Sequence, residues 1–162
     1  MDDIRIRNAA DSDWDGIAAL EAATYPEDRL SGGRQALASS PTTCLVAECD
    51  GQLAGYLLAL PYPLLQCPDP SRAEPSDLRT RNLHIQDLVI APEFGGRWLA
   101  PRLLKHLTQT AMSQQFEHIS TVAVGSTPTL LKRGGFSTYP DVVLPNSYGG
   151  HGTYMSLALP PT

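Results

Sequence analysis

LHIQDLVIAPEFGGRWLAPRLLKHL, residues Leu83–Leu107, is the stretch that decides the fold. Its first part, Leu83–Ile90, is mostly apolar and predicts a strand, whereas its last part repeats apolar residues at helical spacing. Gly95 and Gly96 lie in the connection, where glycine permits close approach and unusual backbone angles. A helix start offers unpaired N–H groups and the positive end of a dipole, so this strand–turn–helix unit is suited to bind a phosphate or pyrophosphate.

Length and composition predict one domain, residues 1–162, with a core of its own. The chain has 162 residues, of which 42% are hydrophobic and 18% charged, as in ordinary globular proteins. The net charge is -5 and Lys and Arg do not cluster, which argues against a nucleic-acid partner. The N-terminus shows neither a basic leader nor an apolar core, and no apolar run is long enough to span a membrane. We therefore expect a cytoplasmic protein without membrane association.

The cysteines predict neither a disulfide framework nor a metal site. Cys44, Cys49 and Cys67 are odd in number and lack the spacing of metal ligands. We expect them to be buried or incidental thiols, and we expect no bound metal.

The remaining patterns alternate between strand and helix. In the first half we expect a strand at Ile4–Arg7, helices at Trp14–Ala23 and Ser31–Ser39, and strands Thr42–Cys49 and Gln52–Leu60 joined at Asp50–Gly51. Five prolines between residues 61 and 81 exclude regular structure there, which is typical of a substrate-side lid or of a disordered connection. In the second half we expect strand Leu83–Ile90, helix Gly96–Met112, strand Glu117–Val124, helix Ser126–Arg133, and closing strands Phe136–Leu144 and Thr153–Leu159.

Three motifs, together with this order of elements, resemble a known family. The segment Gly95–Ala100 follows the fourth strand, Leu130-Leu131-Lys132-Arg133-Gly134-Gly135-Phe136 follows the fifth, and Tyr148–Met155 closes the chain. All three are similar to motifs of the GNAT acyl-CoA-dependent N-acyltransferases. The resemblance implies an α/β fold with about four helices and a mixed, mostly antiparallel sheet of about seven strands, splayed between strands four and five. It also implies acetyl-CoA as co-substrate and, as in many relatives, a homodimer.

The resemblance assigns cofactor-binding residues to the strand–turn–helix unit. The assigned residues are the backbone of Leu88, Val89 and Ile90, the loop residues Gly95, Gly96, Arg97, Trp98, Leu99 and Ala100, and Ser126 after strand five. Two positions depart from the family signature, because Gly95 stands where Gln or Arg is usual and Trp98 stands where glycine is usual. Arg97 is suited to replace the missing cation. As alternatives, the glycines serve the turn alone and Ser126 caps a helix.

Two residues of the fourth strand are candidate catalytic residues. Strict alternation places His84, Gln86, Leu88 and Ile90 on one face, and Ile85, Asp87 and Val89 on the other. His84 lies where relatives carry a base that acts through water, and an imidazole titrates near neutrality. Asp87 is the second candidate, because a carboxylate inside an apolar strand is costly unless it is paired or used. As alternatives, His84 is a surface residue and Asp87 is held by backbone or an arginine.

The acceptor site is predicted at three residues, two of them from the same resemblance. Tyr25 and Glu27 lie in the region that lines the acceptor cleft in relatives, and His151 lies in the glycine-rich turn between the closing strands. The sequence thus predicts an N-acetyltransferase in which a primary amine attacks the thioester directly. The alternative is a catalytically inactive GNAT-like module that binds CoA or a protein partner. It is motivated by Gly95, by Trp98 and by Leu131, which stands where many relatives have a catalytic tyrosine.

Overall fold

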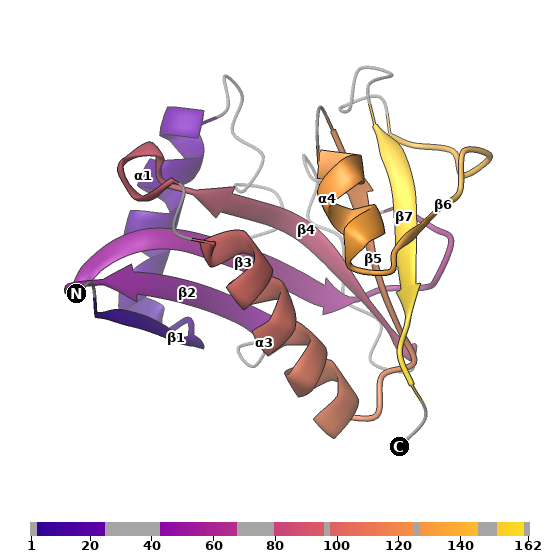
Figure 1. The fold of residues 1–162 in the computed structure, drawn as a ribbon, viewed down its shortest axis with the longest axis horizontal. Coiled ribbons are helices and arrows are strands. Elements are labelled where there is room, and N and C mark those ends of the chain that lie inside the picture. Colours follow the sequence, from indigo (N-terminus) through magenta and orange to yellow (C-terminus); the bar gives the residue numbers. More distant parts are fainter. Residues whose placement is uncertain are drawn as a thin grey trace.

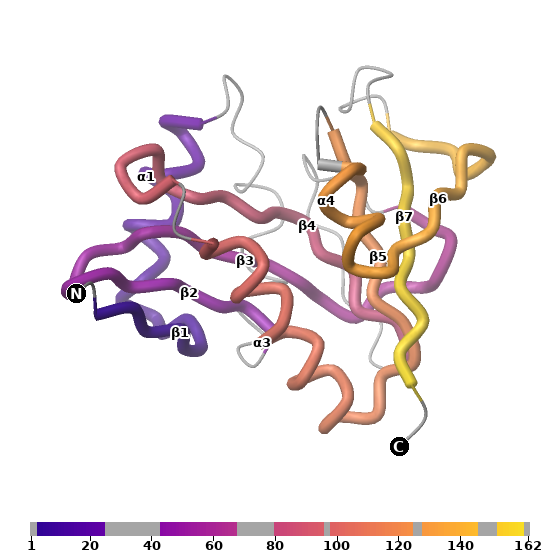
Figure 2. Tube along the Cα trace, in the orientation of Figure 1, coloured from indigo at the N-terminus to yellow at the C-terminus, as the bar shows by residue number. Residues whose placement is uncertain are grey.

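A seven-stranded mixed sheet forms the body of the molecule (Figure 1, Figure 2). The computed structural model describes residues 3–24, 43–67, 80–95, 98–124, 127–145 and 152–160. The strands are β1 (Ile4–Asn8), β2 (Cys44–Cys49), β3 (Gln52–Pro61), β4 (Asn82–Ile90), β5 (His118–Ala123), β6 (Ser137–Thr138) and β7 (Thr153–Ala158), in the spatial order β1-β2-β3-β4-β5-β7-β6. The β4–β5 pair is parallel and the other pairs are antiparallel. The predicted fold class is confirmed.

Helices cover both faces of the sheet. Helices α3 (Leu99–Ser113) and α4 (Thr127–Arg133) pack on one face, where Leu103 and Leu131 join a core that includes Leu57 of β3. Helix α1 (Trp14–Thr24) packs on the other face, where Ile17 meets Leu58, the next residue of β3. Because neighbouring strand residues point to opposite faces, the two cores lie on opposite sides of the sheet. We call these sides the α3 face and the α1 face.

The connections between elements show which of the local predictions were right and which were wrong. The hairpin between β2 and β3 turns at Asp50 and Gly51, with φ of 52° and 81°, which is the left-handed geometry that the Asp-Gly pair predicts. The predicted strand Phe136–Leu144 is wrong in length, because only Ser137 and Thr138 pair with β7. The Tyr139 N–H still donates to the Tyr154 carbonyl at 2.8 Å, but Pro140 comes next and proline cannot donate to a strand ladder. The predicted helix 31–39 and most of the proline-rich segment, residues 68–79, lie outside the described residues.

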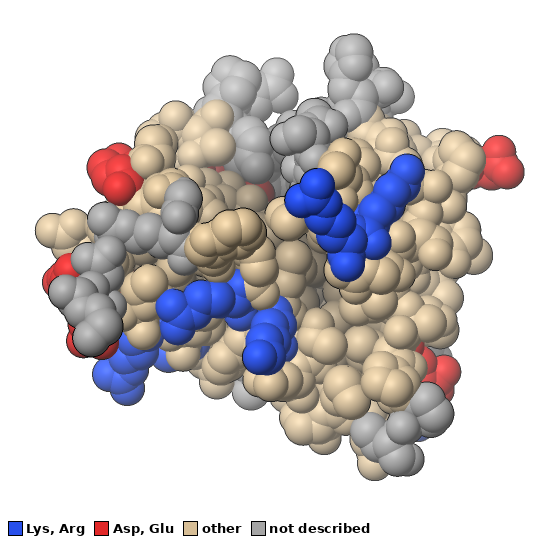
Figure 3. All heavy atoms as spheres, viewed as in Figure 1, with Lys and Arg blue, Asp and Glu red and all other residues tan. Residues whose placement is uncertain are grey.

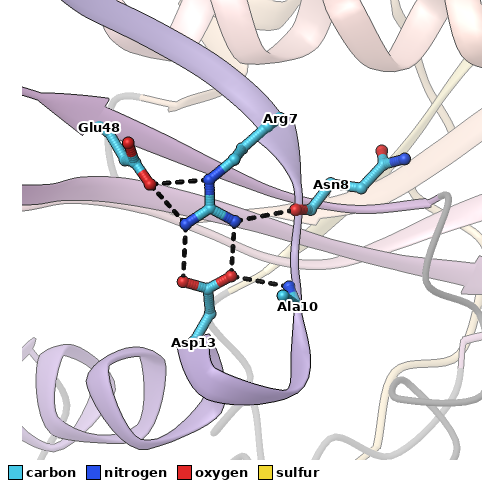
Figure 4. Close-up of polar contacts among 5 residues, drawn as sticks. All are labelled: Arg7, Asn8, Ala10, Asp13 and Glu48. Atoms are coloured by element: carbon cyan, nitrogen blue, oxygen red, sulfur yellow. Dashed lines mark hydrogen bonds and ion pairs between the residues drawn. The ribbon is translucent and has the colours of Figure 1, made fainter. Parts of the chain in front are cut away.

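An ion-pair cluster fastens the first strand to its neighbours (Figure 4). The Arg7 guanidinium donates to Glu48 of β2 and, through two nitrogens, to both carboxylate oxygens of Asp13, at 2.7 and 2.9 Å. Asp13 lies in the 3-10 turn η1 (Asp11–Asp13) that leads into α1, and it also accepts a hydrogen bond from the Ala10 N–H. Hydrogen bonding from Arg7 lowers the pKa of Asp13 below 3.8. This cluster therefore fixes the approach to α1.

A glycine lets β3 lie close to the end of β4. Gly55 pairs with Ile90, and a Cβ at this position would meet the Val89 carbonyl oxygen and Ile90 Cδ1 at 2.7 Å each. Real Cβ atoms essentially never come that close, so a side chain here would displace the β4 backbone. Gly55 therefore fixes where the end of β4 lies.

The cysteines agree with the expectation of buried or incidental thiols. Cys44 and Cys49 are buried, Cys67 is half-buried, and all three are free. Burial raises the pKa of Cys44 to about 12, so this thiol stays protonated at neutral pH. Among the described residues, none of the helices combines the length and the apolar character that crossing a membrane requires.

Candidate functional site

The strands β4 and β5 begin side by side and then diverge (Figure 1). Their parallel pairing covers Asn82–Ile85 against His118–Thr121 and stops there, although β4 continues to Ile90. Beyond Ile85, β4 is paired with β3 on its other side. In the described residues, the edge of β4 that faces β5 thus carries backbone N–H and C=O groups without a strand partner. The predicted splay, and the positions assigned to Leu88, Val89 and Ile90, fall on this open edge.

A β-bulge corrects the predicted faces of β4. Leu58 of β3 pairs with Asp87 and the next residue, Ala59, pairs with Ile85, so Gln86 is an extra residue in β4. Opposed residues of a sheet share a face. His84 and Asp87 therefore both lie on the α1 face, whereas Leu88 and Ile90 pack with the core of the α3 face. The prediction that His84 and Asp87 lie on opposite faces was wrong, because strict alternation does not survive an inserted residue.

Asp87 is a half-buried carboxylate with a tyrosine partner. The Tyr56 hydroxyl of β3 donates to Asp87 Oδ2 at 2.7 Å. Tyr56 is fully buried in the core of the α1 face and pairs with Val89, so packing holds its hydroxyl in place. The Asp87 side chain therefore has a defined position beside the bulge, two residues after the last β4–β5 pair. Sequence reasoning missed Tyr56, which its buried place within an apolar strand did not distinguish from core.

His84 belongs to a buried polar cluster where β4, β5 and β7 meet. Its Nδ1 lies 2.8 Å from Ser120 Oγ, and that oxygen also accepts a hydrogen bond from Asn82 Nδ2 at 2.9 Å. The Tyr154 ring stacks on the imidazole with centroids 6.1 Å apart, and its hydroxyl accepts the Leu65 N–H at 2.8 Å. In the part of the chain that the structure describes, His84 Nε2 has no hydrogen-bond partner. The cluster ties three strands together at the root of the divergence.

The surroundings of His84 speak against its acting as a base. The side chain is 0% exposed, and burial lowers its pKa from 6.5 to about 3. A general base works best when its pKa lies near the operating pH and when the substrate can reach it. The alternative of a surface histidine is contradicted by the burial. The catalytic role of His84 stays a prediction, and the structure favours Asp87 for that role.

The turn after β4 places its left-handed residue at an unexpected position. Gly95 has φ -61°, which any residue adopts, whereas Trp98 has φ 59° and ψ 30°. Gly95 therefore does not use the backbone freedom that glycine permits, and Gly96 lies outside the described residues. Because Trp98 is left-handed, α3 begins at Leu99 rather than at Gly96, and its first bond runs from the Arg102 N–H to the Trp98 carbonyl at 3.3 Å. Within the described residues no side chain caps the helix start, so the N–H groups of Leu99 and Ala100 are placed to meet a ligand.

A groove of about 610 Å³ runs between α3 and α4 on the α3 face. Its wall is mostly apolar and includes Trp98, Leu104 and Phe136, with Lys105 and Arg133 at its rim. Figure 3 shows Lys and Arg atoms gathered over α3 and over α4, with uncharged surface between the two groups. This volume lies in the range of small-molecule sites. The groove joins the start of α3, so the surface around that helix start is both apolar and cationic.

Six predicted site residues lie outside the described residues. These are Tyr25, Glu27, Gly96, Arg97, Ser126 and His151. Their assignments therefore stay predictions. Leu131, at the position where many relatives have a tyrosine, is 2% exposed and packs into the core of the α3 face. Its side chain contributes packing and offers no proton.

Comparison with known proteins decides the family. A model of the acetyltransferase (GNAT) family matches residues 7–130. The chain belongs to the GNAT family. No curated protein sequence matches this GNAT chain.

Solved structures with the GNAT fold resemble the chain over nearly its whole length, at low sequence identity. N-acetylglutamate synthase from Neisseria gonorrhoeae, complexed with coenzyme A and N-acetyl-glutamate, is 20% identical with a TM-score of 0.73; the match covers 98% of this chain but 35% of that one. The GNAT-like decarboxylase GphF in complex with isobutyryl-CoA is 19% identical over 96% and 100% of the two chains, with a TM-score of 0.75. Arabidopsis thaliana Naa50, in complex with the bisubstrate analogue CoA-Ac-MVNAL, is 13% identical over 94% and 97%, with a TM-score of 0.70. At these identities the likeness shows the fold alone.

Proposed function

We propose that this GNAT protein transfers the acetyl group of acetyl-CoA to a primary amine. One observation carries the proposal: the open edge of β4 after Ile85 leads directly to the uncapped start of α3. An extended ligand with amide groups in its middle and phosphates at one end matches this sequence of backbone donors and acceptors. The pantetheine arm and pyrophosphate of CoA have that form. The CoA-type ligands in the three solved structures with this fold support the assignment.

The cofactor contacts follow the order of the chain. The arm lies along the backbone of Leu88, Val89 and Ile90, as an additional strand lies along a sheet edge. The pyrophosphate lies at the N–H groups of Leu99 and Ala100, where the helix dipole favours negative charge. Gly95, Gly96 and Arg97 border this position in the sequence, and Arg97 supplies the cation. Ser126 contacts the arm from the end of β5.

Asp87 is the proposed base for the acyl transfer. The amine nitrogen attacks the thioester carbonyl and forms a bond to its carbon, which makes that nitrogen far more acidic. A carboxylate then suffices to accept the proton, and the carbon–sulfur bond breaks as CoA leaves as a thiolate that takes a proton from solvent. The Tyr56 hydroxyl, 2.7 Å from Asp87 Oδ2, orients the carboxylate. Tyr25, Glu27 and His151 complete the proposal as acceptor contacts.

A non-catalytic CoA-binding module is the second candidate. The exposed Trp98 beside the helix start and the buried Leu131 are the observations that favour it. Both candidate functions require CoA binding, so only a measurement of acetyl-transfer turnover distinguishes them. A homodimer is compatible with either and stays a prediction.

Thermal denaturation with acetyl-CoA, followed by an amine panel, tests the proposal. If acetyl-CoA binds the folded state, the melting temperature rises with the logarithm of ligand concentration above the dissociation constant. The absence of any shift at millimolar acetyl-CoA would remove both candidates. Turnover is then measured as released thiol with amino acids, peptides, polyamines and aminoglycosides as acceptors. A protein that binds acetyl-CoA and acetylates none of them supports the non-catalytic module.

A further inference from the structure

Exposed apolar side chains of the described residues gather beside β6, the edge strand next to β7 (Figure 1). Five large apolar side chains are exposed in those residues, and three of them, Leu65, Tyr139 and Val143, line one pocket of about 550 Å³. Single exposed apolar residues are ordinary, whereas a cluster around a pocket is typical of a surface that binds another molecule. We call this pocket, together with the two residues of β6, the β6 surface.

One buried residue, Tyr154 of β7, supports both walls of the pocket. Its hydroxyl accepts the Leu65 N–H at 2.8 Å, and its ring meets the Tyr139 ring edge-on, with centroids 6.3 Å apart. Leu65 has a φ of 65°, the left-handed conformation that bulky residues rarely adopt, and the bond to Tyr154 holds it there. The exposed apolar side chains thus stand on a fixed base, which reduces the ordering cost of binding a partner.

The backbone of β6 presents hydrogen-bonding groups to a further strand. Among the strands of the described residues, β6 has β7 as its neighbour on one side and none on the other. The Tyr139 N–H donates to the Tyr154 carbonyl, and in an antiparallel pair the backbone groups point alternately toward and away from the partner. The N–H and C=O of Thr138 therefore point away from β7. Because Thr138 also lines the pocket, an extended segment that pairs with it is placed against the apolar wall.

The charge of the pocket selects among extended segments. Asp141 is the one carboxylate in the part of the lining that the structure describes, and apolar side chains surround it. A partner with apolar side chains and one cation matches this wall, whereas an acidic partner is repelled by it. A purely apolar partner would desolvate the carboxylate without pairing it. An anionic lipid surface is disfavoured for the same reason as an acidic partner.

We propose that the β6 surface binds an extended, apolar and basic peptide segment of a partner protein by strand addition. The segment pairs with the backbone of Thr138, packs its apolar side chains against Leu65, Tyr139 and Val143, and sets a lysine or arginine beside Asp141. The chain thereby has a docking site in addition to the proposed transfer site. The inference goes beyond the proposed function and holds whether or not the chain transfers acetyl groups.

A peptide without a primary amine tests the surface separately from acetyl transfer. The probe is the hexapeptide VTVTRT, labelled with fluorescein at its N-terminus and amidated at its C-terminus, so that it cannot be an acceptor. Both valines and the arginine lie on one face of an extended chain. We expect a saturable rise in fluorescence anisotropy with wild-type protein. The absence of binding at about 1 mM protein would overturn the proposal.

N-methylation of the probe tests strand addition itself. Alternate residues of an added strand direct their N–H groups toward the sheet edge or away from it. We therefore expect N-methyl groups on one alternate set of residues to abolish binding and N-methyl groups on the other set to be tolerated. Equal tolerance of both sets would show that β6 does not pair with the peptide.

A charge swap tests the contact with Asp141. Asp141→Lys should weaken binding of VTVTRT at least about fivefold and should bind the charge-reversed peptide VTVTET more tightly than wild-type protein does. Asp11→Lys makes the same change of charge at an exposed residue beside α1, so it serves as the matched control and should leave both dissociation constants within about twofold. Equal effects in the two variants would reduce the preference to net charge and contradict the assigned contact.

Val143→Asp distinguishes a peptide from a second copy of the chain. Val143 is 87% exposed, so the variant folds, and it should bind VTVTRT at least about tenfold more weakly. Sedimentation velocity should show the same oligomeric state for both proteins. A wild-type dimer that Val143→Asp converts to monomer would show that the surface joins two copies, and the peptide site would be wrong. Binding of the probe without any acetyl-CoA thermal shift would remove the proposed function and leave this inference standing.

Discussion

The two halves of β4 differ in how their backbone edges are paired. We call Asn82–Ile85 the closed half and Gln86–Ile90 the open half. In Asn82–Ile85 the backbone is paired on both sides, and the side chains of Asn82 and His84 both hydrogen-bond with Ser120 Oγ in the interior. Among the strands of the described residues, Gln86–Ile90 pairs with β3 and not with β5, and four of these five side chains are half-buried. The most conspicuous titratable group, His84, lies in the closed half. From this difference we expect ligand binding at Gln86–Ile90, where the backbone edge lacks a β5 partner. The buried His84 contributes to holding the strands together.

The largest expected effect separates Asp87 from His84. Asp87→Asn keeps the shape and the Tyr56 contact but removes the proton acceptor, so kcat should fall by about 100-fold or more. The acetyl-CoA dissociation constant should stay within twofold. Steady-state kinetics on the best amine from the panel, together with a binding titration, measures both quantities. The matched variant His84→Gln should retain more than about a tenth of wild-type kcat. If His84→Gln instead lost more activity than Asp87→Asn, His84 would be the base.

Gly55→Ala should disturb the open half through its neighbour. A Cβ 2.7 Å from the Val89 carbonyl oxygen must push β4 aside, and such overpacking costs about 1–3 kcal/mol of the free energy of unfolding. Urea denaturation measures the loss, and acetyl-CoA titration should show weaker binding because the arm lies along the displaced backbone. Gly16→Ala in α1 is the control, since its Cβ meets Leu53 Cδ2 at 3.4 Å and an exposed helical alanine stabilises. Equal stability of the two variants would contradict the close approach of β3 and β4.

The closed half predicts a pH dependence of stability. Neutral His84 has a folded pKa of about 3 against 6.5 when unfolded, so the unfolded state binds the extra proton. Its contribution is therefore complete above pH 6.5 and is lost as the pH falls toward 3, by up to about 1.4 kcal/mol per pH unit. Urea denaturation at pH 7, 6 and 5 should show a steeper fall for wild-type protein than for His84→Gln. Parallel slopes would mean that His84 is solvated.

The smallest expected effect concerns the ion-pair cluster at β1, the edge strand of the sheet away from β5. Asp13→Asn weakens the bonds with Arg7 and should lower the free energy of unfolding by about 1 kcal/mol, with catalysis unchanged. Since Arg7 lowers the pKa of Asp13 below 3.8, the contribution of Asp13 is complete above pH 3.8 and is lost as the pH falls below it. The difference between wild-type protein and Asp13→Asn should therefore shrink in acid. A difference that is constant from pH 6 to 2 would show that the charge is irrelevant.

Regular patterns made the fold predictable from the sequence. The Asp50–Gly51 hairpin, the apolar strands and the amphipathic α3 follow from local spacing, so their positions agree within a few residues. The bulge at Gln86 was not predictable, because nothing in LHIQDLVI signals an extra residue. It is set by pairing with β3, a contact distant in sequence. The same limit explains Tyr56 and Ser120, whose roles exist only once β3, β4 and β5 are neighbours.

The turn before α3 shows a second limit of sequence reasoning. The two adjacent glycines are the residues that most easily adopt positive φ, yet among the described residues of that turn it is Trp98 that takes the left-handed conformation. Glycine permits positive φ but does not require it, so the identity of a residue is a weaker guide than its place relative to the helix start. The buried state of His84 was missed for a related reason. Its three covering partners, Ser120, Tyr62 and Tyr154, come from other segments.

Because of the bulge, the path of β4 depends on the number of its residues more than on their side chains. Removing Gln86 altogether would leave every residue from Leu83 to Ile90 on its present face, because Asp87 would then follow Ile85 in ordinary alternation. What would disappear is the bend that an inserted residue gives a strand. Such a shortened strand could continue straight along β5 and seal the edge on which the proposed arm lies. One extra residue in β4 thus separates a fully paired strand from one with an open edge.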